Sequence, residues 1–275
     1  MTKISVVMPV HFCVDLSKLA RAIKSVLQQS FAPSEILVVV DGSIGANHKN
    51  YLLALSKARL IKLVWLPKNF GPGTARHQGI ELASSGIIAV MDSDDISEPF
   101  RFQVQVEYLK KHKIDVVGGQ IAEFQQNPKH LDRIRRVPLK HDEILKAGKW
   151  RNPMNHVTML FYKRVYKTSG GYPATRHGED YELFVRMVAS GARFANLDQI
   201  LVRVNMSQTS YIERQGMSYL TQEIRLIKRF HSLGYISKVQ LAINVSIRLV
   251  IRLLPLPLLA GFYTLLREKR PRSGL

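Results

Sequence analysis

The first 126 residues alternate short apolar runs with segments of helical character, and this alternation constrains the fold more than any other feature of the chain. Strands that alternate with helices in this way are typical of a doubly wound parallel sheet. We therefore expect an α/β fold with a mostly parallel central sheet flanked by helices. The expected strands are residues 4–10, 36–41, 60–66, 87–91 and 115–118, and the expected helices are residues 16–29, 50–58, 74–83 and 100–111.

The fourth apolar run ends abruptly in three acids, Asp92, Asp94 and Asp95. Ligands of open α/β sheets bind at the carboxyl ends of the strands. Carboxylates this close together repel one another unless protons, basic side chains or a cation compensate them. Oxygen ligands suit Mg²⁺ or Mn²⁺, which commonly bridge to the phosphates of a substrate. The alternative is an acidic turn that caps the next helix, with Ser97 or Asp95 as the N-cap.

Two further loops at the same predicted edge carry polar side chains. Asp41 follows the second strand, where it can accept hydrogen bonds from a ribose or a base, although an ordinary turn acid before a glycine is the alternative. Gly71 and Gly73 allow the backbone to approach a ligand before a helix whose N-terminus favours anions. Arg76, one turn into that helix, can pair with phosphate or stack on a base.

An acid pair, Glu179 and Asp180, stands where a helix is expected to begin. Acids in a first helical turn usually complement the helix dipole. The alternative is a carboxylate held in a cleft as a general base. Upstream, the polar stretch 152–158 leads into an expected strand at residues 159–162, and its His156 is either a turn residue or a substrate contact.

The composition is that of a globular enzyme, with 275 residues and 46% hydrophobic content. A formal net charge of +19 implies anionic partners. The single cysteine, Cys13, excludes an internal disulfide and is expected to be packed. The N-terminal apolar run is short and interrupted by Pro9, which argues against a signal peptide or an N-terminal anchor and predicts a cytoplasmic catalytic part. The basic, irregular residues 127–149 are expected to form a surface excursion.

The C-terminal segment has an amphipathic pattern. Polar residues recur every fourth position between residues 239 and 254, which predicts a helix with a narrow polar face and a wide apolar one. Alternation would also allow a strand, but no hairpin partner is apparent. Neither this piece nor residues 258–266 reaches the roughly 20 residues needed to span a bilayer. In-plane association with an anionic membrane surface is therefore expected, and a helical cover of the domain or a dimer interface is the alternative.

The motifs, in their order and spacing, resemble the inverting glycosyltransferases of family 2, which have the GT-A fold. The resemblance covers roughly residues 3–210. We expect residues 1–210 to form the glycosyltransferase domain and residues 211–275 to form a helical, membrane-associating extension. It rests on Pro9-Val10, Asp41-Gly42-Ser43, Asn69-x-Gly71, Ala75-Arg76-x-x-Gly79, Asp92-Ser93-Asp94-Asp95 with Pro99, Arg101 and Gln105, Gly118-Gly119, Asn155-His156, Gly170-Gly171-Tyr172 and Glu179-Asp180.

The resemblance implies a nucleotide-diphosphate sugar as the donor and Mg²⁺ or Mn²⁺, held by Asp94 and Asp92, as the cofactor. It implies that Asp180 is the catalytic base, with Glu179 beside it, and that transfer inverts the anomeric centre. The donor-binding residues that it implies are Pro9, Val10, Asp41, Asn69, Gly71, Arg76, Asp92 and Ser93, and the acceptor-binding residues are Asn155, His156, Gly171 and Tyr172.

Three positions depart from the family pattern. Val40 stands where a second acid often precedes Asp41, His77 replaces a usual asparagine, and Asn205 replaces a histidine that often serves as a further metal ligand. Residues 210–230 resemble the subgroup that builds bacterial surface polysaccharides and exopolysaccharides. The expected acceptor is accordingly a polyprenyl-diphosphate-linked saccharide at the cytoplasmic face of the inner membrane.

Two other functions are compatible with parts of the sequence. Haloacid-dehalogenase phosphatases also place Asp-x-Asp after an apolar strand, but on an early strand, and that function leaves residues 69–79 and 179–180 without a role. A nucleic-acid binder is suggested by the net charge of +19. Its basic residues, however, are scattered without interleaved aromatics, so no nucleic-acid partner is expected.

Overall fold

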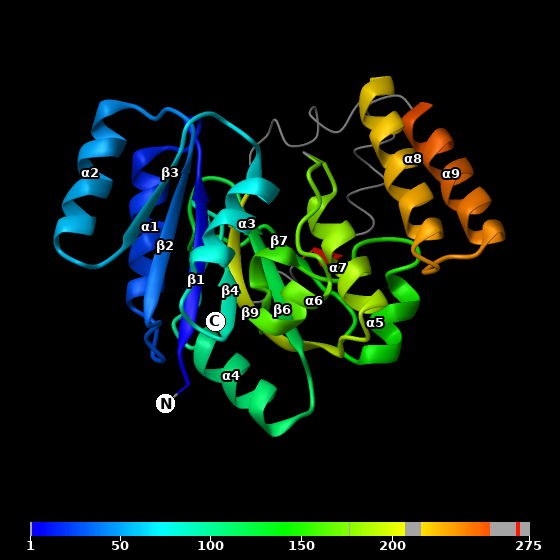
Figure 1. The fold of residues 1–275 in the computed structure, drawn as a ribbon, viewed down its shortest axis with the longest axis horizontal. Coiled ribbons are helices and arrows are strands. Elements are labelled where there is room, and N and C mark those ends of the chain that lie inside the picture. The colour runs from blue at the N-terminus through cyan, green and yellow to red at the C-terminus, as the bar shows by residue number, and fades with distance from the viewer. Residues whose placement is uncertain (1, 176, 207–215, 254–267, 270–275) are drawn as a thin grey trace.

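A computed structural model describes residues 2–175, 177–206, 216–253 and 268–269. The first part of the chain forms a parallel sheet in the order β3-β2-β1-β4, with helices on both faces (Figure 1). The elements are β1 (Ile4–Val10), α1 (Leu16–Leu27), β2 (Glu35–Asp41), α2 (Ala46–Lys57), β3 (Lys62–Leu66), α3 (Pro72–Leu82) and β4 (Ile87–Val90).

Beyond β4 the sheet is mixed. Strand β8 lies antiparallel between β4 and β6, and β6 pairs in parallel with β9. The remaining elements are β5 (Ile96–Ser97), α4 (Arg101–Lys111), β6 (Val116–Phe124), β7 (Arg133–Arg135), α5 (His141–Ala147), η1 (His156–Thr158), β8 (Leu160–Tyr162), α6 (Lys163–Thr168), α7 (Glu179–Ala189), β9 (Phe194–Asn205), α8 (Gly216–Ser232), α9 (Lys238–Leu253) and β10 (Glu268–Lys269). The predicted α/β class and the parallel arrangement of the first four strands are confirmed.

The apolar core lies in two layers, one on each face of the sheet. Along β1, Val6 and Met8 belong to the layer that α1 and α4 cover, whereas Val7 belongs to the layer that α3 and α7 cover. Successive side chains of a strand point to opposite faces, so a strand buried on both faces is apolar throughout. Because helices cover both faces, the loops at the strand ends are the places where a ligand can reach the sheet.

Several sequence expectations need correction. Helix α4 has Phe100 at its N-cap position without a side-chain cap, so neither Ser97 nor Asp95 caps it. Residues 127–149 are not merely a surface excursion, because β7 pairs with β6 and α5 follows it. Cys13 is exposed rather than packed.

Strand β6 continues well beyond its predicted end at Gly118. Glycine usually weakens the interior of a strand, so the pair Gly118-Gly119 inside β6 needs a reason. In the fold, a Cβ atom built at position 119 would lie 2.4 Å from Cδ1 of Leu201 on β9. The missing side chain therefore lets β9 pack closely against β6, and the strand runs on to Phe124.

The C-terminal part forms two packed helices, α8 and α9, at one end of the molecule (Figure 1). The predicted helix over residues 239–254 is confirmed, and the strand alternative is wrong. Ser237 and Gln240 bond reciprocally to each other's backbone N–H groups at the start of α9, which is a capping box. Residues 258–266 lie outside the described residues, as does the predicted boundary at residue 210. Within the described residues, no helix has the length and hydropathy needed to cross a membrane.

Substituting Gly119 tests the close packing of β6 and β9. We expect Gly119→Ala to lower the free energy of unfolding by about 1–3 kcal/mol, because the added methyl group overpacks the contact with Leu201. Gly86→Ala is the matched control, since a Cβ atom there meets nothing within 4 Å, and it should change stability by less than about 0.5 kcal/mol. Urea titration measures both values, and equal stability of the two variants would contradict the packing argument.

Candidate active site

The loops after β2 and β3 are joined by one carboxylate. Asp41 ends β2 and is buried, and its two oxygens accept hydrogen bonds from the backbone N–H groups of Phe70 and Gly71, at 2.8 and 2.9 Å. These two donors belong to the glycine-containing loop that leads into α3. Asp41 therefore fixes the shape of the loop that is predicted to bind the donor, and its own contact with a nucleotide stays a prediction.

Arg76 connects the acids after β4 with the acid pair at the start of α7. Its guanidinium Nη2 lies 2.6 Å from Oδ1 of Asp92, and its Nη1 lies 3.4 Å from Oε1 of Glu179. The side chain is only 7% exposed. Burial is the largest single influence on Arg76 and would lower its pKa, but the charges of Asp92 and Glu179 and the hydrogen bond to Asp92 together raise it. Residues far apart in the sequence thus meet around one permanently charged guanidinium.

The three acids after β4 have different electrostatic environments. Burial is the largest single influence on Asp92 and would raise its pKa, but the charge and hydrogen bond of Arg76, with the charge of Arg101, together lower it. Burial and then the charge of Asp92 raise the pKa of Asp94, and the same two causes raise the pKa of Asp95 well above its ordinary value. Asn205, at the end of β9, donates from its side chain to Asp94 at 3.2 Å and from its backbone N–H to Asp95 at 2.8 Å.

Arg101 is a second buried arginine close to these acids. It is 0% exposed, its Nη2 donates to the Val90 carbonyl at 2.9 Å, and its Nε donates to Gln105 at 3.1 Å. Burial lowers the pKa of Arg101 to about 9, while the charges of Asp92 and Asp95 act in the opposite direction. Arg101 was not among the predicted site residues. The helical spacing of Arg101 and Gln105 with Phe102, Val106 and Leu109 could have marked it as buried.

The acid pair begins helix α7. The helix follows Gly178, whose φ of +71° is unfavourable for other residues, and a Cβ atom there would lie 2.6 Å from Leu226 of α8. Burial and then the charge of Asp180 raise the pKa of Glu179 to about 7. Asp180 accepts a hydrogen bond on Oδ2 from the side-chain amide of Asn152, at 2.9 Å.

The predicted acceptor residues separate into two groups. His156 bonds through Nε2 to the hydroxyl of Tyr172 at 2.7 Å, and burial followed by the charge of Arg76 lowers the pKa of His156 to about 4. Asp92 and Asp180 act on the same imidazole in the opposite direction, so His156 lies near both acid motifs. Asn155 is buried and donates to the carbonyl of Gly119 at 2.8 Å, which is a structural contact.

The other predicted site residues lie at the end of a strand or in loops. Pro9 and Val10 end β1, Ser93 is buried between Asp92 and Asp94, and Asn69 precedes the glycine loop. Gly171 has a φ of +67° and packs against Tyr166, whose hydroxyl accepts from the backbone N–H of Tyr172 at 3.2 Å. The structure therefore brings Arg76 and Asp92 of the predicted donor residues together with Glu179 of the acid pair, and the roles of all these residues remain predictions.

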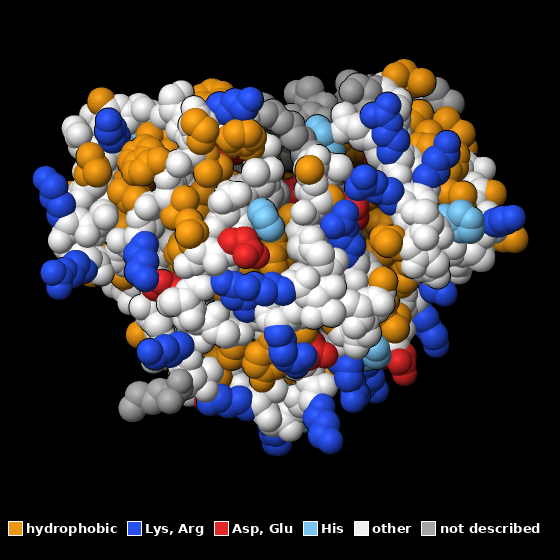
Figure 2. All heavy atoms as spheres, in the orientation of Figure 1, with side chains coloured by type: hydrophobic (Ala, Val, Ile, Leu, Met, Phe, Trp, Pro, Cys, Tyr) orange, Lys and Arg blue, Asp and Glu red, His pale blue; other side chains and the backbone are white. Residues whose placement is uncertain are grey.

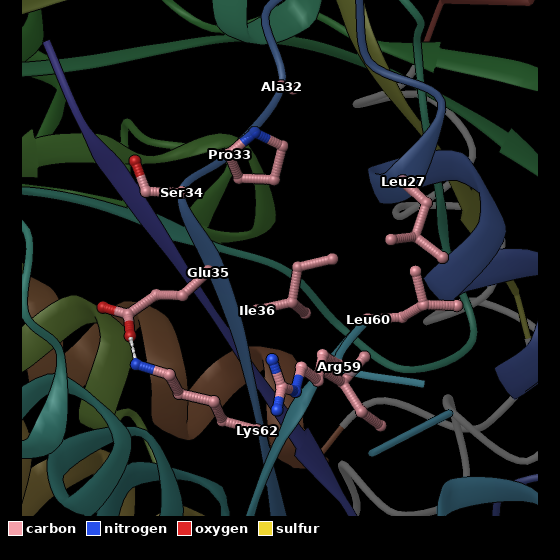
Figure 3. Close-up of a pocket in the computed structure, with 10 residues that line it drawn as sticks. Leu27, Ala32, Pro33, Ser34, Glu35, Ile36, Arg59, Leu60 and Lys62 are labelled. Carbon is pink, nitrogen blue, oxygen red and sulfur yellow. Dashed lines mark hydrogen bonds and ion pairs between the residues drawn. The ribbon is translucent and has the colours of Figure 1, made fainter. Parts of the chain in front are cut away.

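One cavity of about 250 Å³ lies away from these residues, at the amino ends of β2 and β3 (Figure 3). Glu35 points toward Lys62 in this cavity and forms an ion pair with it. Burial would raise the pKa of Glu35, but hydrogen bonds from Lys62, Ser5 and Ser84 lower it to about 2. The carboxylate is thus already bonded within the protein, and the cavity lies at the edge opposite to the acids after β4.

Comparisons with known proteins agree with this geometry. The sequence model of glycosyl transferase family 2 matches residues 5–168. The amylovoran biosynthesis glycosyltransferase AmsE of Erwinia amylovora is 30% identical over 89% of this chain and 92% of its own length. The Escherichia coli UDP-Gal:α-D-GlcNAc-diphosphoundecaprenol β-1,3-galactosyltransferase is 30% identical over 92% of each chain. The structure of S. aureus TarS in complex with UDP-GlcNAc has a TM-score of 0.67 at 16% identity, covers 90% of this chain and 72% of that one, and shares the fold.

Proposed function

We propose a function from the premise that this chain belongs to glycosyltransferase family 2. In this proposal it transfers a sugar from a nucleotide-diphosphate donor to a saccharide hydroxyl, with inversion of the anomeric centre. The observation that carries the proposal is the guanidinium of Arg76, which contacts both Asp92 and Glu179. The acid cluster proposed to bind the donor and the acid pair proposed to act on the acceptor therefore lie at one site. Family membership decides against the phosphatase alternative.

The donor-binding part of the proposal concerns Asp92, Asp94 and the loop held by Asp41. Asp92 is already paired with Arg76, whereas Asp94 accepts a hydrogen bond from the neutral amide of Asn205 and has a raised pKa. Uncompensated carboxylate charge of this kind fits Mg²⁺ or Mn²⁺. Among the described residues no three His, Cys, Asp or Glu side chains form a metal cluster, so a cation held by Asp94 would take further ligands from water or from the donor. Such a cation would supply positive charge to the leaving diphosphate.

The base in this proposal is Asp180. Glu179 is engaged with Arg76, while Asp180 is bonded to Asn152 through one oxygen, which leaves the other oxygen for an acceptor hydroxyl. As the acceptor oxygen forms a bond to the anomeric carbon, its proton passes to Asp180, and the bond to the nucleoside diphosphate breaks. A single displacement of this kind inverts the anomeric centre.

We expect Asp180→Asn to lower turnover by roughly 10²- to 10⁴-fold, the usual worth of a positioned general base. Donor affinity should be retained, because the amide fills the same space. Glu179→Gln is the comparison variant and should have a smaller effect. Turnover of acceptor and calorimetric binding of the donor are measured on the same preparations. Near-wild-type turnover of Asp180→Asn would reject the base assignment, since asparagine is also a good helix cap.

We expect Asp94→Asn to lower turnover by at least about 100-fold, because the carboxylate that holds the cation is lost. EDTA should abolish wild-type turnover, and Mn²⁺ or Mg²⁺ should restore it. Asp198→Asn is the control, since Asp198 is an exposed acid that forms a surface ion pair with Arg136. Circular dichroism establishes that each variant is folded, and wild-type turnover undiminished by EDTA would refute the metal assignment.

The acceptor and location form a further part of the proposal. The Escherichia coli relative is named for a diphosphoundecaprenol-linked acceptor, and the Erwinia amylovora relative for amylovoran biosynthesis. We infer that this chain likewise extends a lipid-linked saccharide in bacterial polysaccharide synthesis at the cytoplasmic face of the membrane. Screening nucleotide sugars with Mn²⁺, beginning with UDP-galactose and UDP-N-acetylglucosamine, identifies the donor. If the protein transfers sugar from none of these donors to any saccharide, the proposal is contradicted.

Helix α9 supports membrane association because its polar and apolar faces are reversed relative to an ordinary surface helix. Asn244 is 0% exposed and donates to the Lys149 carbonyl at 3.1 Å, and Arg248 bonds to Asn244. The polar stripe therefore faces the protein. The opposite stripe is exposed and apolar. In Figure 2, hydrophobic side chains show at the edge of the molecule over α9, beside Lys and Arg side chains over α8. The exposed residues of the stripe are Val239, Ile243, Ile247, Leu249 and Val250. An anionic bilayer suits such a stripe on a chain of net charge +19.

We expect the double variant Ile243→Ser/Ile247→Ser to float less with anionic vesicles than the wild type, because it removes the centre of the stripe. High salt should also weaken wild-type binding, since exposed charges are screened. Leu60→Ser/Leu82→Ser is the matched control, because these exposed leucines lie away from α9. Equal flotation of the stripe variant would contradict the membrane assignment. A shift in its oligomeric state by light scattering would favour a dimer interface instead.

A further inference from the structure

We propose that Asn152 is the residue that positions the base, by holding one oxygen of the Asp180 carboxylate. The side-chain Nδ2 of Asn152 donates to Oδ2 of Asp180 at 2.9 Å. The two residues are 28 positions apart in the sequence, so the fold alone brings them together. This inference rests on the proposed function, because it assigns Asn152 a role through the base.

The orientation of the Asn152 amide is determined by two different partners. Its Oδ1 accepts a hydrogen bond from the backbone N–H of Met154 at 3.1 Å, in a turn of the Asx type. The backbone N–H can only donate, and an ionised carboxylate can only accept. If the amide were flipped, its oxygen would face the Asp180 carboxylate and its NH₂ group would face the Met154 N–H. The side chain of Asn152 therefore presents a donor to Asp180 in one orientation only.

The backbone of Asn152 is also held in place. Its carbonyl accepts a hydrogen bond from Nη2 of Arg135 at 3.0 Å, and the carbonyl of Arg135 accepts from the amide of Asn155 at 3.3 Å. Arg135 ends strand β7, which pairs with β6. The amide that contacts the base is thereby connected to the central sheet, so its position does not depend on a free loop.

The contact gives the two oxygens of Asp180 different tasks. The titratable groups that act on this part of the site are Glu179, His156 and Arg76, and Asn152 is the neutral donor bonded to Asp180 itself. With Oδ2 held, rotation of the carboxylate is restricted and Oδ1 keeps a fixed direction for the acceptor hydroxyl. A base that is misdirected by about 1 Å can lose about 10²-fold in rate. Asn152 is thus a positioning residue that acts through Asp180.

The decisive variant is Asn152→Asp, which keeps the Oδ1 acceptor for Met154 and replaces the donor to Asp180 by an oxygen. We expect kcat to fall by about 10- to 100-fold while the KM for the nucleotide sugar stays unchanged. The assay uses the nucleotide sugar with the highest turnover in the panel screen. The matched control is Asn127→Asp, because Asn127 accepts from the Lys129 backbone N–H at 3.0 Å in the same kind of turn and is exposed. This control should leave kcat unchanged.

A double-mutant cycle with Asp180→Asn separates positioning from a purely structural role. If Asn152 acts through the base, adding Asn152→Asp to Asp180→Asn lowers kcat no further, because the base is already lost. Independent, multiplicative losses would overturn the inference, as would a kcat of Asn152→Asp equal to that of the wild type. Wild-type turnover of Asp180→Asn alone is a distinct result, since it rejects Asp180 as the base and the role of Asn152 with it.

Discussion

The compensation of clustered acids by two buried arginines is the constraint on which the site depends. Asp95 is buried and Asp92 and Asp94 are half-buried where β4 ends, and uncompensated carboxylates are costly in such a position. Arg76 reaches Asp92 from α3, and Arg101 adds a second positive charge from α4. Because Arg76 also contacts Glu179, the guanidinium that compensates the charge of Asp92 also joins the two acid motifs of the site.

The strand and helix pattern was readable from the sequence because β1, β2 and β4 are buried on both faces and therefore largely apolar. Asp92 and Asp41 could be placed at one edge for the same reason. The sequence did not reveal that Gly119 lies inside a strand, because only its partner Leu201 explains the missing side chain. The contact of Asn152 with Asp180 was equally hidden, since a single asparagine in a polar stretch gives no periodic signal.

The C-terminal helices link the catalytic acids to the surface proposed to meet the membrane. Glu182 of α7 is buried and bonded to Arg229 of α8 at 2.8 Å, one helical turn beyond the Glu179-Asp180 pair. Helix α9 packs on α8 and presents its apolar stripe outward. In our proposal, an acceptor carried on a lipid would meet the base on the side of the protein that carries this stripe.

The central claim is that the donor and acceptor acids act in one direct displacement at the site joined by Arg76. The anomeric configuration of the first product formed tests this claim most directly. Proton NMR of the transferred sugar, recorded before any mutarotation or further reaction, distinguishes the two anomers. An anomeric configuration opposite to that of the nucleotide sugar is the predicted result. Retention of the donor configuration would contradict the single displacement and the role of Asp180 as its base.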